Sequence, residues 1–297
     1  MNDLNGSMEL HHLRCVVAIA DHGTFTEAAA ALHVSQPALS HAVARLEREV
    51  GSRLFERSPA RTRLTEAGRA LLGPARRALA EADNGLVAVA AVAGLLSGEL
   101  RLTGVRTAVV ETAQLVVEFH RRHPGVYVVI DEPTGDSGVI EAVRGALCDV
   151  GIIHSTEKTA DLPGVRAGAQ EIVAVFPQAL APATERVTMD YLSDVPFVAP
   201  AGGTGIRAAY DAFFGDRARR PPIVAECSDQ SMLIELVRSG LGAAISSASR
   251  VAALDSDGLA VRPIRPRMRT ELTAIRRRHA SPAANAFCRM LASPALP

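Results

Sequence analysis

Apolar residues between positions 35 and 50 recur at three- and four-residue steps, a spacing that predicts an amphipathic helix. The apolar stripe consists of Leu39, Val43, Leu46 and Val50. Ser35 is a suitable N-cap, and Pro37 falls in the first turn, where its missing N–H costs no hydrogen bond. The opposite face offers Gln36, Ser40 and His41, short polar side chains of the kind that reach base edges when a helix enters the major groove. A helix that only packs on a core fits the same pattern.

The residues before this helix predict two further helices and complete a helix-turn-helix layout. The first helix starts near Met8 and ends at Gly23, a typical helix stop. Its apolar face consists of Leu10, Leu13, Val17 and Ala20. A short second helix over residues 27–32 is capped by Thr24 or Thr26, and its alanines permit a neighbouring helix to approach closely. A two-residue turn then leads into the helix described above.

Two short extended pieces after Gly51 flank a Ser-Pro turn and predict a β-hairpin. Arginines along this hairpin are placed to meet phosphates or a minor groove, as in a DNA-binding wing. An ordinary solvated hairpin fits the same residues, but the preceding helices favour the wing. The candidate DNA-binding residues are therefore Ser35, Gln36, Pro37, Ser40, His41, Arg57, Arg61 and Arg63.

A long helix is predicted from Glu66 towards Val92, with Thr65 as its cap. Its apolar residues follow an a/d heptad seam of the kind that pairs helices. From that seam, the candidate dimerisation residues are Leu72, Leu79, Leu86 and Val89. Pro74 inside the helix removes a backbone hydrogen bond and tends to produce a kink. A helix packed on its own domain is the alternative; a dimer is favoured because a single helix-turn-helix usually needs a twin on a two-fold site.

From Gly98 onward, strands alternate with helices, a pattern typical of an open, mainly parallel α/β sheet. Predicted strands cover residues 99–103, 127–130, 150–153, 171–176, 197–198, 223–226 and 242–245, and predicted helices cover residues 107–123, 137–147, 205–214 and 230–239. The pattern occurs twice and implies two lobes, with ligands expected where strand C-termini face helix N-termini. The candidate effector-binding residues at such positions are Arg106, Thr107, Thr134, Gly202, Gly203, Thr204 and Ser228.

Arg106 is the expected charged contact in that site, because a guanidinium holds a carboxylate with two hydrogen bonds. The predicted effector is therefore a small organic acid. A surface salt bridge for Arg106, and simple helix caps for Thr107, Thr134 and Thr204, stay open as alternatives. Residues 201–205 are glycine-rich but lack the Lys-Ser/Thr ending of a phosphate-binding P-loop.

Composition narrows the class of protein further. The 297 residues suffice for two or three domains, and 32 basic and 32 acidic residues give no net charge that would indicate nucleic acid. The four cysteines lie far apart without zinc or disulfide spacing, which fits a reducing cytosol. No signal sequence or membrane-spanning run occurs, since the most apolar stretch, residues 85–96, is too short. Residues 1–7 carry no pattern, so Met8 is the expected functional start.

No enzymatic site is predicted. The histidines lack the carboxylate spacing of a metal site, no GxSxG elbow occurs, and no catalytic residue or cofactor is expected. Cys148 and Cys227 lie at the edges of predicted strands and are interpreted as core thiols rather than as reactive sensors.

Residues 8–66 resemble the winged helix-turn-helix of LysR-type transcriptional regulators. The matching residues are Leu13, Phe25, Thr26, Ala28, Ala29, Leu32, Ser35-Gln36-Pro37-Ala38-Leu39-Ser40, Leu46-Glu47, Gly51, Leu54-Phe55-Glu56-Arg57 and Leu64-Thr65-Glu66-Ala67-Gly68. The resemblance implies that Gln36, Pro37 and Ser40 approach bases and backbone, and that Arg57 and Arg61 contact the backbone near the wing. His41 stands where the family very often has arginine, and Ala42 follows where a polar residue is usual, so the operator sequence is expected to differ and some phosphate affinity to be lost.

The C-terminal half resembles the effector-binding domain of the same family, a two-lobed α/β fold similar to periplasmic binding proteins. The matching residues are Gly98-Glu99-Leu100-Arg101-Leu102, Phe119, Pro124, Asp149, Gly151-Ile152, Leu192, Pro196-Phe197-Val198 and Val237-Arg238-Ser239-Gly240-Leu241-Gly242. The implied division is a winged helix-turn-helix over residues 1–65, a linker or dimerisation helix over 66–97 and an effector-binding domain over 98–297. Lobe I would cover about 98–168 and 269–297, and lobe II about 169–268.

Together these observations predict a cytoplasmic, homodimeric or homotetrameric regulator. It binds a dyad operator in double-stranded DNA, senses a small-molecule effector and has no membrane partner. The alternative is a small-molecule binding protein or hydrolase with an incidental helical N-terminal domain. Retention on heparin and a gel shift of upstream DNA, set against turnover of candidate metabolites, distinguish the two.

Overall fold

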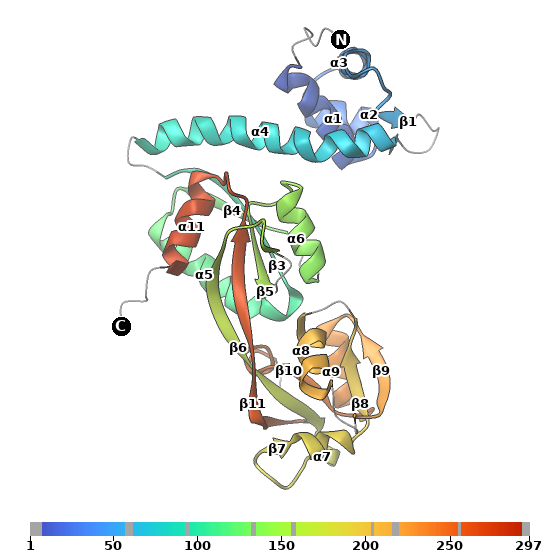
Figure 1. The fold of residues 1–297 in the computed structure, drawn as a ribbon, viewed down its shortest axis with the longest axis vertical. Helices are drawn as coiled ribbons and strands as arrows, with labels where there is room; N and C mark the ends of the chain where they lie inside the picture. The colour runs from blue at the N-terminus through green and yellow to red at the C-terminus, as the bar shows by residue number, and fades with distance from the viewer. Residues whose placement is uncertain are drawn as a thin grey trace. The chain divides into compact units, whose positions relative to one another are not determined.

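Residues 8–56, 62–92, 96–131, 135–155, 159–202, 205–215, 220–254 and 257–292 are described by the computed structural model (Figure 1). The chain divides into two compact units, one mainly Met1–Leu95 and the other mainly the chain from Leu96 onward. Within the described ranges, no helix is both long and apolar enough to cross a bilayer.

The N-terminal unit contains the predicted helix-turn-helix. Its helices are α1 (Leu10–His22), α2 (Phe25–Ala31) and α3 (Gln36–Val50). Thr24, rather than Thr26, caps α2, and Ser35 caps α3. Each side-chain oxygen accepts a hydrogen bond from the backbone N–H of the residue three positions later. Gly23 and Gly51 end α1 and α3 in the left-handed conformation, with φ of 79° and 70°. Local cap and stop signals therefore set the end of α1 and both ends of α3 as predicted, whereas α2 covers residues 25–31 rather than the predicted 27–32.

The core of this unit is formed by α1, α2, α3 and the first half of the long helix that follows. Its most buried large side chains are Leu13, Val16, Ile19, Leu39, Val43, Leu46, Leu54 and Phe55. The predicted stripe of α3 is confirmed, except that Val50 at its end is 36% exposed. The predicted face of α1 was partly wrong, because Leu10 is 42% exposed whereas Val16 and Ile19 are buried. Helix α1 packs against α2, α3 and α4, so its buried surface is wider than a single stripe.

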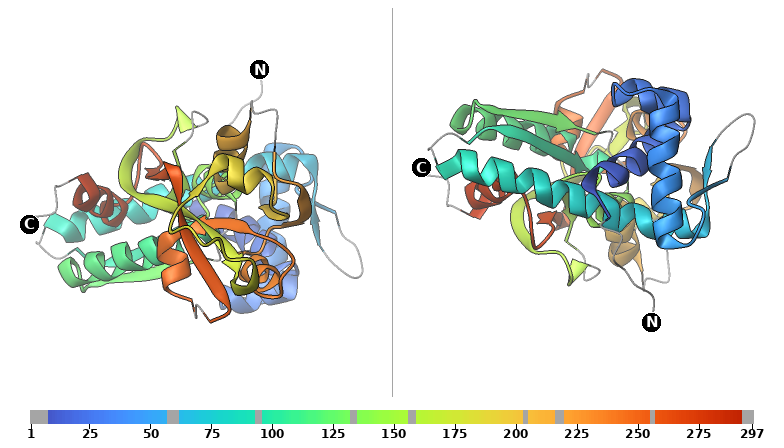
Figure 2. Two further views of the ribbon diagram at one scale, coloured as in Figure 1. Left: turned by 90° about the horizontal axis from the view of Figure 1, so that it is seen from below. Right: turned by 90° about the horizontal axis from the view of Figure 1, so that it is seen from above.

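The predicted wing is present as a two-stranded hairpin. Strand β1 (Phe55–Glu56) pairs antiparallel with β2 (Arg63–Leu64), and Figure 2 shows the two strands side by side. Glu47 of α3 holds the start of this hairpin, since its Oε1 accepts the backbone N–H groups of Leu54 at 2.7 Å and Phe55 at 3.3 Å. One carboxylate therefore fixes the wing relative to α3.

The long helix α4 (Glu66–Val92) has the predicted bounds, and it is continuous through Pro74. The Thr65 hydroxyl accepts the Gly68 N–H at 3.0 Å and so caps its first turn. Gly68 must be a glycine, because an added Cβ would lie 2.1 Å from the Leu54 carbonyl oxygen. The start of α4 therefore packs directly on the backbone that leads into the wing.

The C-terminal unit is built on one mixed sheet with the strand order β10-β6-β11-β5-β3-β4. Its strands are β3 (Gly98–Gly104), β4 (Val126–Ile130), β5 (Val150–His154), β6 (Gly164–Pro177), β10 (Ala244–Ser247) and β11 (Leu259–Arg276), with β7 (Val187–Thr188) paired to β11. Strand β3 is parallel to β4 and β5, but β11 is antiparallel to both β5 and β6. The prediction of a mainly parallel sheet is therefore confirmed for β3, β4 and β5 but was wrong for β6, β10 and β11, which pair antiparallel with one another.

The long strands β6 and β11 connect two groups of elements, as Figure 1 shows. Lobe I contains β3, β4 and β5 with α5 (Val109–Arg122), α6 (Asp136–Arg144) and α11 (Pro282–Ala292). Lobe II contains the parallel pair β8 (Phe197–Pro200) and β9 (Ile223–Cys227), strand β10, and helices α7 (Met189–Ser193), α8 (Gly205–Phe214), α9 (Gln230–Arg238) and α10 (Ala248–Ala252).

Aromatic contacts close the core of each lobe. In lobe I, the ring of Phe119 on α5 packs edge-on against Phe287 on α11, with centroids 5.3 Å apart. In lobe II, Tyr210 on α8 packs against Phe197 and Phe214 at centroid distances of 5.3 and 4.7 Å. These rings are almost fully buried, and each of them buries more apolar area than a smaller aliphatic side chain does. Each lobe therefore has its own core, joined by the two shared strands.

Candidate functional site

The first two turns of α3 present a polar surface. Gln36, Pro37 and His41 are exposed, and Ser40 is half-buried. The Gln36 side-chain amide donates to the Ser40 hydroxyl at 3.0 Å, which orients both groups on the helix surface. The opposite stripe of α3 is buried, so this polar end is free to contact a partner without disturbing the core.

The wing adds exposed positive charge beside α3. Arg63 on β2 is exposed, whereas the predicted residues Arg57 and Arg61 lie outside the described part of the chain. Arg69 on α4 donates to the Leu64 carbonyl at 2.9 Å and so fixes the end of β2. The described wing therefore offers Arg63 for a phosphate contact on a hairpin that is held at both ends.

The predicted dimerisation residues of α4 divide into two groups. Leu79 is only 9% exposed because it packs in the N-terminal core, and Leu72 is half-buried. Leu86 and Val89 are 74% and 73% exposed. The first half of the seam therefore serves the chain's own fold, and the second half leaves apolar side chains uncovered.

A buried chain of polar side chains joins three segments of lobe I. The Nδ1 atom of His154, at the end of β5, lies 3.1 Å from Asp136 Oδ2, and its backbone N–H donates to Asp136 Oδ1 at 2.7 Å. The Nε2 atom of the same imidazole lies 3.1 Å from the Thr107 hydroxyl. Asp136, His154 and Thr107 are 7%, 6% and 6% exposed, so this chain is shielded from bulk water.

The order of these groups determines their hydrogen-bonding roles. With the Asp136 carboxylate accepting the Nδ1 proton, a neutral imidazole leaves Nε2 to accept the Thr107 hydroxyl proton. A protonated imidazole donates from both nitrogens, so the Thr107 oxygen then becomes the acceptor. The proton on His154 therefore decides whether the Thr107 hydroxyl still has a proton to offer another group.

Residues of strands β6 and β10 contact the same threonine. The Thr107 carbonyl accepts from the Gln170 side chain on β6 at 2.8 Å and from the Ser247 hydroxyl on β10 at 3.5 Å. Gln170 and Thr270 are register partners on β6 and β11. Gln170 Oε1 and Thr270 Oγ1 are buried without a hydrogen-bond partner in the described part of the chain. A polar molecule that reached this position could satisfy both atoms.

The other predicted effector residues do not belong to this buried polar chain. The Arg106 Nη1 atom lies 4.0 Å from Asp229 Oδ2, a long ion pair between two partly exposed side chains. Ser228 and Gly202 are exposed, and Thr134, Gly203 and Thr204 lie outside the described residues. Among the predicted positions, Thr107 is the one that the structure places in the buried polar chain.

Three further members of the chain, namely Asp136, His154 and Gln170, were not among the predicted site residues. A usable signal existed for two of them. His154 directly follows the predicted strand 150–153, and Asp136 directly precedes the predicted helix 137–147. These are the strand C-terminal and helix N-terminal positions at which α/β folds bind ligands.

The cysteines carry no sign of redox chemistry. Burial raises the pKa of the Cys148 thiol to about 12, and the neighbouring Asp149 charge adds to the rise. Burial also raises the pKa of Cys15 and of Cys288, so these thiols stay protonated at neutral pH. Cys227 is half-buried and donates to the Asp229 carbonyl at 3.2 Å, so it is less enclosed than predicted. Within the described ranges, no cluster of histidine, cysteine, aspartate or glutamate side chains has the arrangement to hold a metal ion.

Comparison with known proteins decides the class. Residues 10–69 match the family model described as bacterial regulatory helix-turn-helix protein, lysR family, and residues 93–294 match the model described as LysR substrate binding domain. The chain belongs to the LysR family. It is a LysR-type transcriptional regulator with an effector-binding domain, and the predicted fold class is confirmed. The matches do not support the alternative of a binding protein or hydrolase with an incidental N-terminal domain.

Individual LysR relatives cover most of the chain. The uncharacterized HTH-type transcriptional regulator YnfL of Escherichia coli is 32% identical over 254 residues, which cover 82% of this chain and 83% of that protein. The RuBisCO operon transcriptional regulator of Allochromatium vinosum is 28% identical over 293 residues, or 94% of each chain. These matches extend over both units rather than over the helix-turn-helix alone.

Solved LysR structures have the same fold. Full-length OxyR from Pseudomonas aeruginosa has a TM-score of 0.77 at 23% identity, covering 99% of this chain and 100% of that one. CbnR in complex with its target DNA has a TM-score of 0.72 at 23% identity, covering 96% and 99%. The regulatory domain of Synechocystis CcmR in complex with 2-PG has a TM-score of 0.59 at 18% identity, covering 66% and 96%.

Proposed function

We propose that this regulator is a cytoplasmic homodimer, or a dimer of dimers, that binds a dyad operator in double-stranded DNA. A small organic acid that enters the C-terminal unit changes that binding. The observation that carries the proposal is the polar end of α3, where exposed Gln36 is hydrogen-bonded to Ser40 on a helix whose other face is buried. No catalytic activity and no cofactor form part of the proposal.

In this proposal, α3 enters the major groove with its N-terminal end leading. Gln36, Ser40 and His41 meet base edges, while Ser35 and Pro37 set the approach of the backbone. The wing arginines contact phosphates, namely Arg57, Arg61 and Arg63. The similar CbnR has been solved with its target DNA, which supports this use of the fold.

The proposed division of the chain follows the sequence prediction. A winged helix-turn-helix covers residues 1–65, a linker helix covers 66–97 and the effector-binding domain covers 98–297. Lobe I consists of about 98–168 and 269–297, and lobe II of about 169–268. Two-fold operators require a paired protein, and the uncovered side chains of Leu86 and Val89 on α4 are the proposed contact with a second chain.

The proposed effector site is the buried polar chain around Thr107. The unpartnered atoms of Gln170 and Thr270 support a polar ligand there, because a buried polar atom without a partner costs free energy that a ligand recovers. Arg106 supports an acid, since its long contact to Asp229 leaves the guanidinium able to bind a carboxylate. The similar CcmR domain holds the small molecule 2-PG.

A salt titration of DNA binding tests the proposal. DNA is selected from a randomised library, and its affinity is measured by fluorescence anisotropy at several salt concentrations. Replacing Arg57 and Arg61 by alanine is expected to weaken binding and to flatten the log–log salt slope by about 2 per bound subunit, or about 4 for a dimer, because each lost phosphate contact removes about 0.9. The matched control replaces Arg121 and Arg122, two exposed arginines on α5, and should keep the slope. An unchanged slope in the wing variant, or failure to select any DNA, would contradict the proposal.

A further inference from the structure

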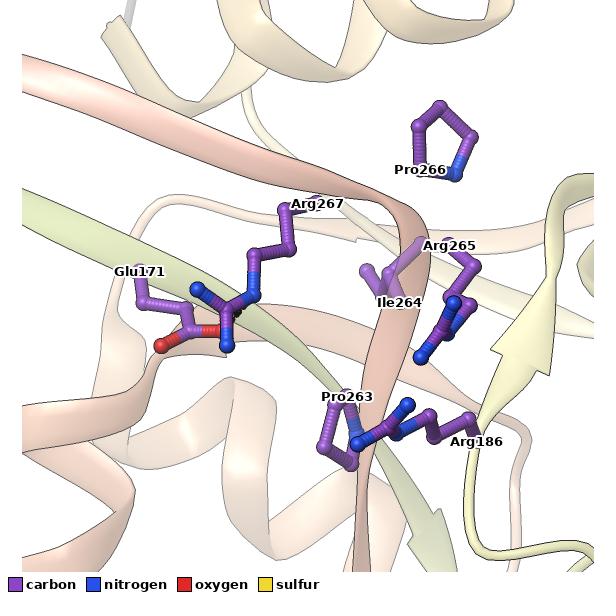
Figure 3. A pocket seen from close by; sticks show the side chains of 7 residues that line it. All are labelled: Glu171, Arg186, Pro263, Ile264, Arg265, Pro266 and Arg267. Carbon is purple, nitrogen blue, oxygen red and sulfur yellow. Dashed lines mark ion pairs between the residues drawn. The ribbon is translucent and has the colours of Figure 1, made fainter.

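A cavity lies in lobe II, at the bend of β11, and three arginines are among its lining residues (Figure 3). Its volume is about 500 Å³, within the range of small-molecule sites. The lining residues are Glu171, Arg186, Pro263, Ile264, Arg265, Pro266 and Arg267. The cavity therefore combines three guanidinium groups and one carboxylate with walls of proline and isoleucine.

The pairing of β11 explains how these residues come together. Pro263 and Met268 of β11 pair with Val173 and Ile172, which are adjacent on β6, so residues 264–267 have no partner on that strand. Ile264 and Arg265 pair instead with β7. The excursion of β11 away from β6 opens the cavity and brings Arg265 and Arg267 near Arg186, which directly precedes β7.

The charges in this cavity are not balanced. Arg267 Nε lies 3.8 Å from Glu171 Oε1, and in Figure 3 its guanidinium lies beside that carboxylate. The side chains of Arg186 and Arg265 lie on the other side of the close-up, beside Pro263. Among the described residues, no carboxylate forms an ion pair with Arg186 or Arg265. The positive charges of Arg186 and Arg265 repel each other, and an anion bound between them would attract both and offset that repulsion.

We propose that this cavity binds a small organic polyanion, a metabolite with at least two phosphate or carboxylate groups. Guanidinium forks match both groups in geometry, and three of them select for more than one negative charge. Pro263 and Pro266 are exposed and supply apolar surface that a metabolite backbone needs and that a bare ion does not, whereas Ile264 is almost fully buried beneath them. The site is separate from the polar chain around Thr107, and it does not depend on the function proposed for that chain.

Strand β6 places this cavity next to the interlobe polar chain. Glu171 lines the cavity, and the preceding residue, Gln170, donates to the Thr107 carbonyl. Successive residues of a strand point to opposite faces, so the two sites use opposite faces of the same two-residue segment.

Calorimetric titration of the full chain with pyrophosphate and with the tricarboxylate tricarballylate tests the proposal, at an ionic strength held constant with sodium chloride. Binding of pyrophosphate alone would indicate a site for bare anions, whereas one site per chain with a Kd below about 1 mM is expected for tricarballylate, which has the carbon backbone that the proposal requires. The variant Arg186→Gln/Arg265→Gln should weaken that binding by at least about tenfold, the effect of losing roughly 1.4 kcal/mol of binding free energy. The control variant Arg121→Gln/Arg122→Gln makes the same charge change on α5 and should stay within about twofold of wild type.

Three results would overturn the proposal. The first is that tricarballylate gives no saturable heat, whether or not pyrophosphate binds. The second is an equal loss in both double variants, which indicates general charge attraction. The third is a cavity variant that keeps its affinity for the probes but loses affinity for DNA, which makes the arginines a nucleic-acid contact. Thermal melting of each variant by circular dichroism verifies that the fold is intact, and Arg265→Lys separates charge from guanidinium geometry because it keeps only the charge.

Discussion

The two units handle their polar side chains in opposite ways. In the N-terminal unit, Gln36 and Ser40 lie on the outer face of a helix whose packing does not depend on them. In the C-terminal unit, Asp136, His154 and Thr107 are buried and supply one another's hydrogen bonds. The difference teaches that a polar group can be dispensable for the fold on a surface and indispensable in an interior, because only the interior group has no water to replace a lost partner.

The largest expected difference follows from removing one polar group from each region. Asp136→Ala leaves the backbone and ring N–H groups of His154 unpaired. The free energy of unfolding should therefore fall by roughly 4 kcal/mol. Gln36→Ala removes an exposed side chain and should change stability by less than about 0.5 kcal/mol. Urea unfolding followed by circular dichroism measures both. Asp136→Asn keeps an acceptor oxygen and should fall between them; equal stabilities for all three variants would remove the contrast.

A second comparison separates the two halves of α4. Leu79→Ala leaves a cavity in the core and should destabilise the N-terminal unit by about 3 kcal/mol. Self-association should stay unchanged, because this side chain is buried. Leu86→Asp should leave the unit's stability nearly unchanged and should weaken self-association, since Leu86 is 74% exposed. Light scattering and urea unfolding are the two readouts. If Leu86→Asp keeps the wild-type mass down to micromolar concentration, the exposed half of α4 is not the contact between chains.

A smaller effect is expected at two glycines that serve the helix-turn-helix and its wing. Gly68→Ala places a methyl group against the Leu54 carbonyl and should cost about 2 kcal/mol. Gly51→Ala meets no atom but must hold a φ of 70°, so about 1 kcal/mol is expected. Thermal melting checks the order of the two values. A larger loss at Gly51 than at Gly68 would mean that α4 can shift away from the wing.

The N-terminal unit could be predicted almost completely because its signals are local. Ser35 and Thr65 cap the first turns of α3 and α4, and Gly51 ends α3. Each of these residues interacts only with residues a few positions away, so both ends of α3 and the start of α4 can be predicted from the sequence. The exposed polar end of α3 could be predicted for the same reason, since it depends only on helical spacing. The face of α1 was less certain, because three other helices pack around it.

The C-terminal unit could be predicted only in part. Strand β11 was missed because Pro263, Pro266 and a run of arginines interrupt the apolar–polar alternation typical of a strand. It forms nevertheless because it pairs with β6, which lies about a hundred residues earlier and leaves no local signal. The polar chain was missed because Thr107, Asp136, His154 and Gln170 come from four separate segments. Their spacing in the sequence carries no motif, and only the sheet topology brings them together.

The ratio of specific to non-specific DNA affinity tests most directly that α3 recognises bases. Wild type, Gln36→Ala/Ser40→Ala and Thr26→Ala are compared on library-selected DNA and on the same DNA scrambled, at one salt concentration. Thr26 is exposed on α2, where contacts to the DNA backbone carry no sequence information, so its variant should keep the ratio. We expect the α3 double variant to lower the ratio by about tenfold or more, while non-specific affinity stays the same. A ratio equal to that of wild type would contradict the assignment of α3 as the base-reading helix.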